Sequence, residues 1–254
     1  SLTSQAQVQQ KNPAAAAATL QKAVELNPGD AGLHSQFGLV KLEAGDVDTA
    51  MAELNTAAGL DKKRVEPLVA LTLLHLRQKQ YDLALDTLEQ LRATVPNSPV
   101  VYNLIGVVHL NKKNDAEARR QFERALELQP VYMAATINLA QMDLRDGKPQ
   151  AAEARYKNVL AKDSNNLLAL LALADLARAR KDEQAFLDLL ARAIKAQPAA
   201  PQAHLAMAQH YLAKNDKQKA LSEAHQALSA NPDNLDALET MGRIQLAMGE
   251  YESA

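Results

Sequence analysis

The chain has 254 residues, a net charge of −2 from 28 basic and 30 acidic side chains, and a composition that is 47% hydrophobic but only 4% aromatic. Balanced charge without a clustered basic face excludes the electrostatic footprint that nucleic-acid binding needs, and no polybasic segment favours an anionic lipid surface. Cysteine is absent, which excludes disulfides, thiolate metal sites and a cysteine nucleophile but suits oxidising and reducing compartments alike.

Neither a membrane-spanning segment nor a signal peptide is visible in the sequence. There is no run of about 18 apolar residues, the length that a transmembrane helix requires, and residues 1–12 lack the apolar core of a signal peptide. Because the chain begins without Met and stops at Ala254 part-way through a repeat, we expect it to be a fragment of a longer protein. Any signal or lipid anchor would then lie outside it.

A period of 34 residues runs through the whole chain, and it is the signature of a stacked repeat protein. Prolines recur at multiples of this spacing, with Lys62 and Ser164 at the two positions that lack one: Pro28, Pro96, Pro130, Pro198 and Pro232. Alanines recur in the same way, with Phe186 as the exception: Ala16, Ala50, Ala84, Ala118, Ala152, Ala220 and Ala254. The period divides the chain into a partial repeat (1–30), six complete repeats (31–64, 65–98, 99–132, 133–166, 167–200, 201–234) and a second partial repeat (235–254).

Each repeat predicts two helices. The first covers about positions 1–14 of the repeat, as in residues 99–112, where Val101, Leu104, Ile105 and Val108 form an apolar stripe with helical spacing. The second covers about positions 17–30, as in residues 115–128. The proline at position 32 ends the second helix because proline cannot continue it.

Turn and cap residues mark the helix ends. Glycine at position 15 suits a left-handed residue after a helix, and a short polar side chain at position 16 caps the next one: Gly45, Gly147 and Gly249; Asp46, Asn114, Asp182 and Asp216. A further set of N-caps precedes the first helices: Asp30, Ser98, Asn166 and Asn234. Small residues at position 8 let the two helices of a repeat cross closely: Gly38, Gly106 and Gly242.

These positions resemble the tetratricopeptide repeat (TPR) family. Its pattern has a large residue at position 4, Leu at 7, Gly or Ala at 8, Tyr at 11, Ala at 20, Phe or Tyr at 24, Ala at 27 and Pro at 32. Residues 99–132 match it through Tyr102, Ile105, Gly106, Ala118, Phe122, Ala125 and Pro130. The resemblance covers nearly the whole chain and implies an all-α, right-handed superhelical solenoid of antiparallel helix pairs. The absence of tryptophan and the varied residues at position 11 depart from the pattern.

Three stretches also resemble a narrower family, the TPR lipoprotein of bacterial PEP-CTERM/exosortase systems: SPVVYNLIGVVHL (98–110), ATINLAQMDLRDGKPQAAEARY (135–156) and NLLALLALADLARARKDEQAFLDLLARAIKAQP (166–198). This resemblance implies a place in exopolysaccharide export and protein sorting. It also implies a periplasmic location in the bacterial cell envelope, through an N-terminal lipid anchor outside this chain. A cytoplasmic location is the alternative.

The motifs of catalysis are absent from the sequence. It has no phosphate-cradling glycine loop, no HExxH pair and no GxSxG motif. Four of the histidines follow the repeat, His34 and His204 at position 4 and His75 and His109 at position 11, and the register arranges no further ligands around them. We therefore interpret them as packing or surface residues, and we predict no catalytic residue, no metal, no cofactor and no enzymatic activity.

Binding residues are predicted where the first helices leave the apolar pattern. The TPR resemblance implies that first helices line a concave face, whose positions 2, 5, 6, 9, 12 and 13 meet the ligand. Position 9 changes along the array from Leu39, Leu73 and Val107 to polar residues, whereas position 5 shows no such gradient. The predicted partner-binding set is Leu73, Asn103, Val107, Asn138, Gln141, Arg145, Asp175, Arg178, Gln209 and Arg243.

The predicted ligand is an extended polypeptide. Its apolar side chains would lie near Leu73 and Val107, and its acidic groups near Arg145 and Arg178. Its backbone amides would pair with side-chain amides, which both donate and accept: Asn103, Asn138 and Gln141. Solvated surface without a ligand is the alternative interpretation. The family's carboxylate clamp for chaperone peptides is not expected, because only Asn138 matches its pattern.

The predicted function is a non-catalytic scaffold that binds partner proteins within a bacterial envelope export or sorting system, without nucleic acid or direct membrane insertion. Alternatives are a carbohydrate-binding or chaperone-like role toward an exported polymer, and a regulatory arm of a larger enzyme. The aromatic residues of the first helices, Phe37, Tyr102 and Tyr211, occupy core positions, which disfavours sugar binding. Apolar surface at the cut repeats would favour end-to-end self-association.

Overall fold

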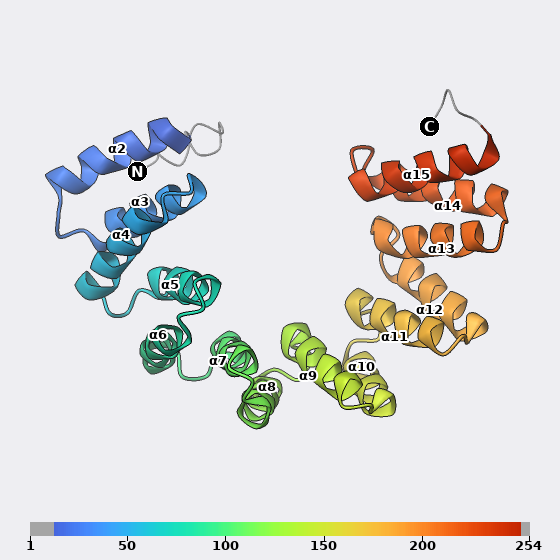
Figure 1. The fold of residues 1–254 in the computed structure, drawn as a ribbon, viewed down its shortest axis with the longest axis horizontal. Coiled ribbons are helices and arrows are strands. Elements are labelled where there is room, and N and C mark those ends of the chain that lie inside the picture. The colour runs from blue at the N-terminus through green and yellow to red at the C-terminus, as the bar shows by residue number, and fades with distance from the viewer. Residues whose placement is uncertain (1–12, 250–254) are drawn as a thin grey trace. The chain divides into compact units, whose positions relative to one another are not determined.

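The computed structural model describes residues 13–249, and every regular element in that range is an α-helix (Figure 1). The starts of repeat 1–30 and the end of repeat 235–254, including Ala254, lie outside the described residues. The predicted all-α solenoid is confirmed, with these helices: α2 (Pro13–Leu26), α3 (Ala31–Glu43), α4 (Val47–Leu60), α5 (Val65–Arg77), α6 (Tyr81–Thr94), α7 (Pro99–Asn111), α8 (Asp115–Leu128), α9 (Met133–Arg145), α10 (Pro149–Lys162), α11 (Leu167–Ala179), α12 (Glu183–Ala196), α13 (Pro201–Ala213), α14 (Lys217–Ala230) and α15 (Leu235–Met248).

First and second helices alternate along the chain, and each pair is joined by a short turn (Figure 1). The first helices α3, α5, α7, α9, α11 and α13 have 13 residues each, one fewer than predicted, while the second helices have 14. Position 14 is the C-cap of these six helices, and the residue at position 15 is left-handed in every described repeat. The first helix α15 has 14 residues, as predicted, and is also followed by a left-handed residue.

This left-handed residue is set by the turn and not by its amino-acid type. The predicted glycines Gly45, Gly147 and Gly249 have φ of 82°, 72° and 87°. The other repeats place a residue with a Cβ in the same conformation, with φ between 59° and 61°: Lys79, Lys113, Lys181 and Asn215. The left-handed conformation costs a residue with a Cβ roughly 1–2 kcal/mol. The packing of the two helices must therefore impose the turn.

The predicted caps hold with one exception. At position 16, each of the four predicted side chains accepts a hydrogen bond from the backbone N–H three residues later, and Asp30, Asn166 and Asn234 also cap their first helices. Ser98 makes no side-chain cap. Its backbone carbonyl accepts the Val101 N–H at 3.1 Å instead, and Pro99 supplies no N–H, so little is left for the hydroxyl to satisfy.

Buried side chains form a series of small clusters in place of one large core. The chain divides into an N-terminal half (residues 1–129) and a C-terminal half (residues 130–254), each compact by itself. In the N-terminal half, Leu68, Leu88 and Val101 join α5, α6 and α7. In the C-terminal half, Leu170, Phe186 and Met207 join α11, α12 and α13. Each cluster spans neighbouring helices only, as expected of a repeat array.

Glycine at position 8 is required where the opposite helix carries a large side chain. A Cβ on Gly106 would lie 2.5 Å from the Phe122 ring, and one on Gly38 would lie 2.8 Å from Leu54. Gly59, near the end of α4, has nothing within 4 Å of such a Cβ. The two kinds of glycine should therefore respond oppositely to the same substitution.

We expect Gly106→Ala to lower the free energy of unfolding by about 1–3 kcal/mol, because the methyl group overpacks against Phe122. Gly59→Ala should raise it by up to about 1 kcal/mol, because alanine favours the helix and meets no neighbour. Urea unfolding followed by far-UV circular dichroism measures both. Equal effects of the two variants would contradict the close contact at position 8.

Acid should weaken the turn at position 16. A hydrogen bond from Lys41 lowers the pKa of Asp46, and one from Lys219 lowers the pKa of Asp216. A depressed pKa in the folded state contributes stability above the unfolded value, and this is lost as the pH falls through the folded value. The double variant Asp46→Asn, Asp216→Asn keeps a capping oxygen at both positions. We expect its urea unfolding midpoint to decrease less between neutral and acidic pH than the midpoint of the wild type. An unchanged pH dependence would contradict this.

Candidate functional site

A polar depression lies on the first-helix layer of the C-terminal half. It has a volume of about 330 Å³, and its lining comes only from the first helices α11, α13 and α15: Asp175, Arg178, Gln202, Leu205, Ala206, Gln209, Asp236, Glu239, Thr240 and Arg243. Four of the predicted binding residues meet here, namely Asp175, Arg178, Gln209 and Arg243. Leu205 and Thr240 are buried and form its floor.

Two of these side chains are already paired with each other. Arg178 Nη2 donates to Asp175 Oδ1 at 2.6 Å, and the Arg178 guanidinium also lies 5.9 Å from the centroid of the Phe186 ring. The expected role of Arg178 as a free partner for an acidic ligand therefore changes. A ligand carboxylate would have to compete with Asp175 for the Arg178 guanidinium. Arg178 and Asp175 together present a neutralised ion pair at the edge of the depression.

The free polar groups of the depression lie on α13 and α15. Gln209, Asp236, Glu239 and Arg243 are exposed, and their side chains make no hydrogen bond or ion pair within residues 13–249. Gln202 is exposed and unpaired in the same way, so the site presents two amides, one guanidinium and two carboxylates to a ligand. Gln202 and Asp236 were not chosen from the sequence, although both hold position 2, one of the positions that the family resemblance marks.

The predicted residues of α9 do not line this depression. Gln141 and Arg145 are exposed and Asn138 is half-buried. Asn138 and Arg145 are not without partners in the folded chain. Gln141 therefore keeps its predicted freedom to bind, and the other two side chains would have to exchange an existing interaction for a ligand.

In the N-terminal half the predicted residues differ in exposure. Leu73 is 52% exposed and Val107 is half-buried, so position 9 offers apolar surface there. Asn103, at position 5, is only 8% exposed and is not without a partner, so it does not present a free amide as expected. Val69, at position 5 of the preceding repeat, is also packed, against the cluster that contains Leu68 and Val101.

Contrary to the expectation that the register places no carboxylate near them, the histidines at position 4 are each held by a carboxylate at position 23, on the second helix of the same repeat. His34 Nδ1 lies 2.6 Å from Glu53 Oε2, and His204 Nδ1 lies 2.7 Å from Glu223 Oε2. No cluster of three or more His, Asp or Glu side chains suited to a metal occurs among residues 13–249. Within the same range, no helix combines the length and apolar character that crossing a membrane requires.

The chain belongs to the tetratricopeptide repeat family. Models of that family match residues 7–71, 41–108, 99–130, 137–201 and 205–254, which is nearly the whole chain. Arrays of this family are typically non-catalytic scaffolds, and they commonly bind proteins. The family match agrees with the helix pairs described above.

Two curated relatives come from cellulose synthase operons. The cellulose synthase operon protein C of Pseudomonas fluorescens is 24% identical over 251 residues, which is 93% of this chain and 20% of that protein. The cellulose synthase 1 operon protein C of Komagataeibacter xylinus is 27% identical over 177 residues, 65% of this chain and 13% of that protein. The chain thus spans a fifth or less of these relatives.

A solved structure shows the same fold over nearly the whole chain. A tetratricopeptide repeat protein from Parabacteroides merdae superposes with a TM-score of 0.63 at 16% identity, covering 97% of this chain and 96% of that one. At this identity the likeness establishes the fold alone.

Buried and exposed residues of the predicted binding set should differ in how much their substitution changes the free energy of unfolding. We expect Asn103→Ala to lower the free energy of unfolding by about 1–3 kcal/mol, because it removes a buried polar group and leaves its partner unsatisfied. Arg243→Ala should change stability by less than about 0.5 kcal/mol, because the side chain is exposed and unpaired. Urea unfolding of both variants tests this, and a neutral Asn103→Ala would contradict a stabilising role of the buried amide.

Proposed function

We propose that this chain is a non-catalytic scaffold that binds a partner polypeptide on its first-helix layer. The observation that carries the proposal is the depression of the C-terminal half, where the first helices α13 and α15 present unpaired Gln209, Asp236, Glu239 and Arg243 above a buried floor. Folding does not need these groups, since none makes a polar contact within the described residues. A peptide backbone supplies the donors and acceptors that such a mixed set pairs with.

The first-helix layer of the N-terminal half fits the apolar part of such a partner. Leu39 and Leu73 share position 9 and are 37% and 52% exposed. Exposed apolar side chains at one repeat position offer contact area without polar competition. We propose that Leu73 and Val107 contact apolar side chains of the partner, as the sequence predicts.

Aromatic side chains favour protein over sugar as the ligand. Carbohydrate sites usually stack sugar rings on exposed aromatic faces. Every phenylalanine and tyrosine among residues 14–249 is buried or half-buried; Phe37, for example, is 4% exposed. The cellulose synthase operon relatives nevertheless make a polysaccharide-binding or chaperone-like role toward an exported polymer the second candidate.

We also propose that the scaffold works in a bacterial envelope system for exopolysaccharide export and protein sorting, held in the periplasm by a lipid anchor on the full-length protein. Two things support this: the resemblance of residues 98–110, 135–156 and 166–198 to the PEP-CTERM lipoprotein, and the relatives from cellulose synthase operons. Protease treatment of spheroplasts tests the location. Protection of the full-length protein until the inner membrane is lysed would place it in the cytoplasm instead.

Cross-linking pull-down tests the binding site. We expect the double variant Gln209→Ala, Arg243→Ala to lose about 90% of the captured partner, because it removes one of the two free amides and the free guanidinium of the depression. Its matched control is Arg192→Ala, Gln226→Ala, which removes the same residue types from exposed positions of α12 and α14. Circular dichroism checks that both are folded.

The control variant should capture the partner as the wild type does. Equal capture by the site variant would overturn the site assignment. Binding of cello-oligosaccharide that the site variant abolishes, with no captured protein, would favour the second candidate.

A further inference from the structure

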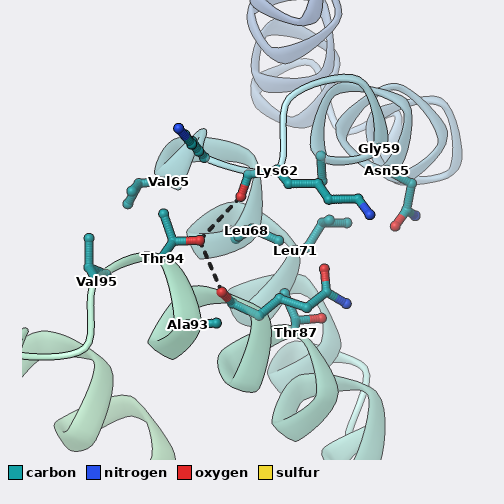
Figure 2. A pocket seen from close by; sticks show the side chains of 13 residues that line it. Asn55, Gly59, Lys62, Val65, Leu68, Leu71, Thr87, Ala93, Thr94 and Val95 are labelled. Atoms are coloured by element: carbon teal, nitrogen blue, oxygen red, sulfur yellow. Dashed lines mark hydrogen bonds between the residues drawn. The ribbon is translucent and has the colours of Figure 1, made fainter.

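A second cavity lies in the N-terminal half, between the second helices α4 and α6. Its volume is about 950 Å³, near the upper end of the range of roughly 300–1,000 Å³ for binding pockets. Figure 2 shows Asn55 and Lys62 on one side, Thr87, Ala93 and Thr94 on the other, and Leu68 and Leu71 between them. This cavity belongs to the second-helix layer and shares no residue with the first-helix site.

The cavity exists because this repeat has small residues where others have large ones. Ala58 holds position 28 of its repeat, a position that carries a larger side chain in the other complete repeats: Arg92, Leu126, Leu160, Ile194 and Leu228. Leu160, Ile194 and Leu228 pack into the clusters between neighbouring helix pairs. Gly59 follows Ala58 and adds no side chain, so the space between α4 and α6 stays open.

The floor of the cavity is apolar and its hydroxyls are already satisfied. Leu68 and Leu71 are 3% and 2% exposed. Thr87 Oγ1 donates to the Leu83 carbonyl at 2.8 Å, and Thr94 Oγ1 lies within 3.2 Å of the Lys62 and Gln90 carbonyls (Figure 2). The floor therefore suits an apolar side chain, and the hydroxyls of Thr87 and Thr94 need no further hydrogen-bond partner from a ligand.

The rim of the cavity is positively charged. Lys62 and Lys63 are exposed, and neither ammonium group forms an ion pair within residues 13–249. The lining contains no acidic side chain, although the chain as a whole has a net charge of −2. Lys62 stands at position 32, where five other repeats carry proline. The rim thus complements an anionic group placed beside an apolar one.

We propose that this cavity binds a segment of a partner polypeptide in which an apolar side chain stands next to acidic residues. The apolar side chain enters over Leu68 and Leu71, and the carboxylates meet Lys62 and Lys63. The cavity is open to solvent, because the lining residues at its mouth are exposed on both walls: Asn55, Gly59, Gln90 and Ala93. An open mouth favours a polypeptide segment that continues beyond the cavity, in preference to a small enclosed ligand.

A peptide array tests the proposal with the full 254-residue chain. The probes are immobilised decapeptides with one leucine and two aspartates at varied spacing, and two matched sets with asparagine for aspartate or serine for leucine. We expect the wild type to retain the leucine–aspartate set at least about tenfold better than either control set. Free dodecanoate, titrated by calorimetry, represents a small amphipathic anion of the same chemistry.

Two cavity variants and two control variants assign the binding to the cavity. Ala58→Leu places the residue of the equivalent position in other repeats into the cavity, so it should fold and bind at least about tenfold more weakly. Lys62→Glu, Lys63→Glu should lose binding to a similar degree, while Lys22→Glu on α2, an exposed lysine outside the cavity, should keep it. Gln209→Ala, Arg243→Ala should also keep it, which separates this site from the first-helix site.

Several outcomes would overturn the proposal. These are equal retention of the three peptide sets, full binding by Ala58→Leu, and loss of binding by Lys22→Glu as strong as by the rim variant. Binding of dodecanoate that Ala58→Leu abolishes, without retention of any leucine–aspartate peptide, would assign the cavity to a small amphipathic anion and reject a polypeptide.

Discussion

The rest of the structure depends on one contact, between position 8 of the first helix and position 24 of the second. Position 24 is at most 6% exposed in every described repeat: Leu20, Leu54, Leu88, Phe122, Tyr156, Leu190 and Ala224. A large side chain there needs a small one opposite, as Phe122 needs Gly106. Because this contact brings the helices close, the chain must reverse within a few residues, and the left-handed residue at position 15 follows.

Close pairing within repeats leaves the surface positions free to vary. A repeat array is stabilised by contacts within each unit and with its neighbours, so residues outside those contacts carry little folding energy. Gln209 and Arg243 are of this kind, and so are Lys62 and Lys63. Different parts of the array can therefore hold different chemistry, with mixed charge on first helices of the C-terminal half and a basic rim in the turn between α4 and α5 of the N-terminal half.

The sequence predicted the helices, caps and turn well because these depend on the residue at one repeat position. Asp182 caps α12 for the same reason that Asp46 caps α4. It predicted the candidate sites less well because exposure depends on neighbouring helices. Asn103 is buried and has a partner in the folded chain, and Arg178 is paired with Asp175 one turn earlier. Neither relation follows from counting positions within one repeat.

The cavity at Ala58 illustrates a signal that a repeat sequence does contain. A regular period shows which size of side chain each repeat position usually carries. A repeat with a smaller side chain at one position is therefore expected to leave a cavity at that position. Most such losses would cost stability, since cavities in a core are expensive. Ala58 lies at the edge between second helices, where solvent reaches the space, and the core positions Leu54, Leu88 and Leu91 remain buried. The array can therefore open a binding site at this position without weakening the contacts that hold the repeats together.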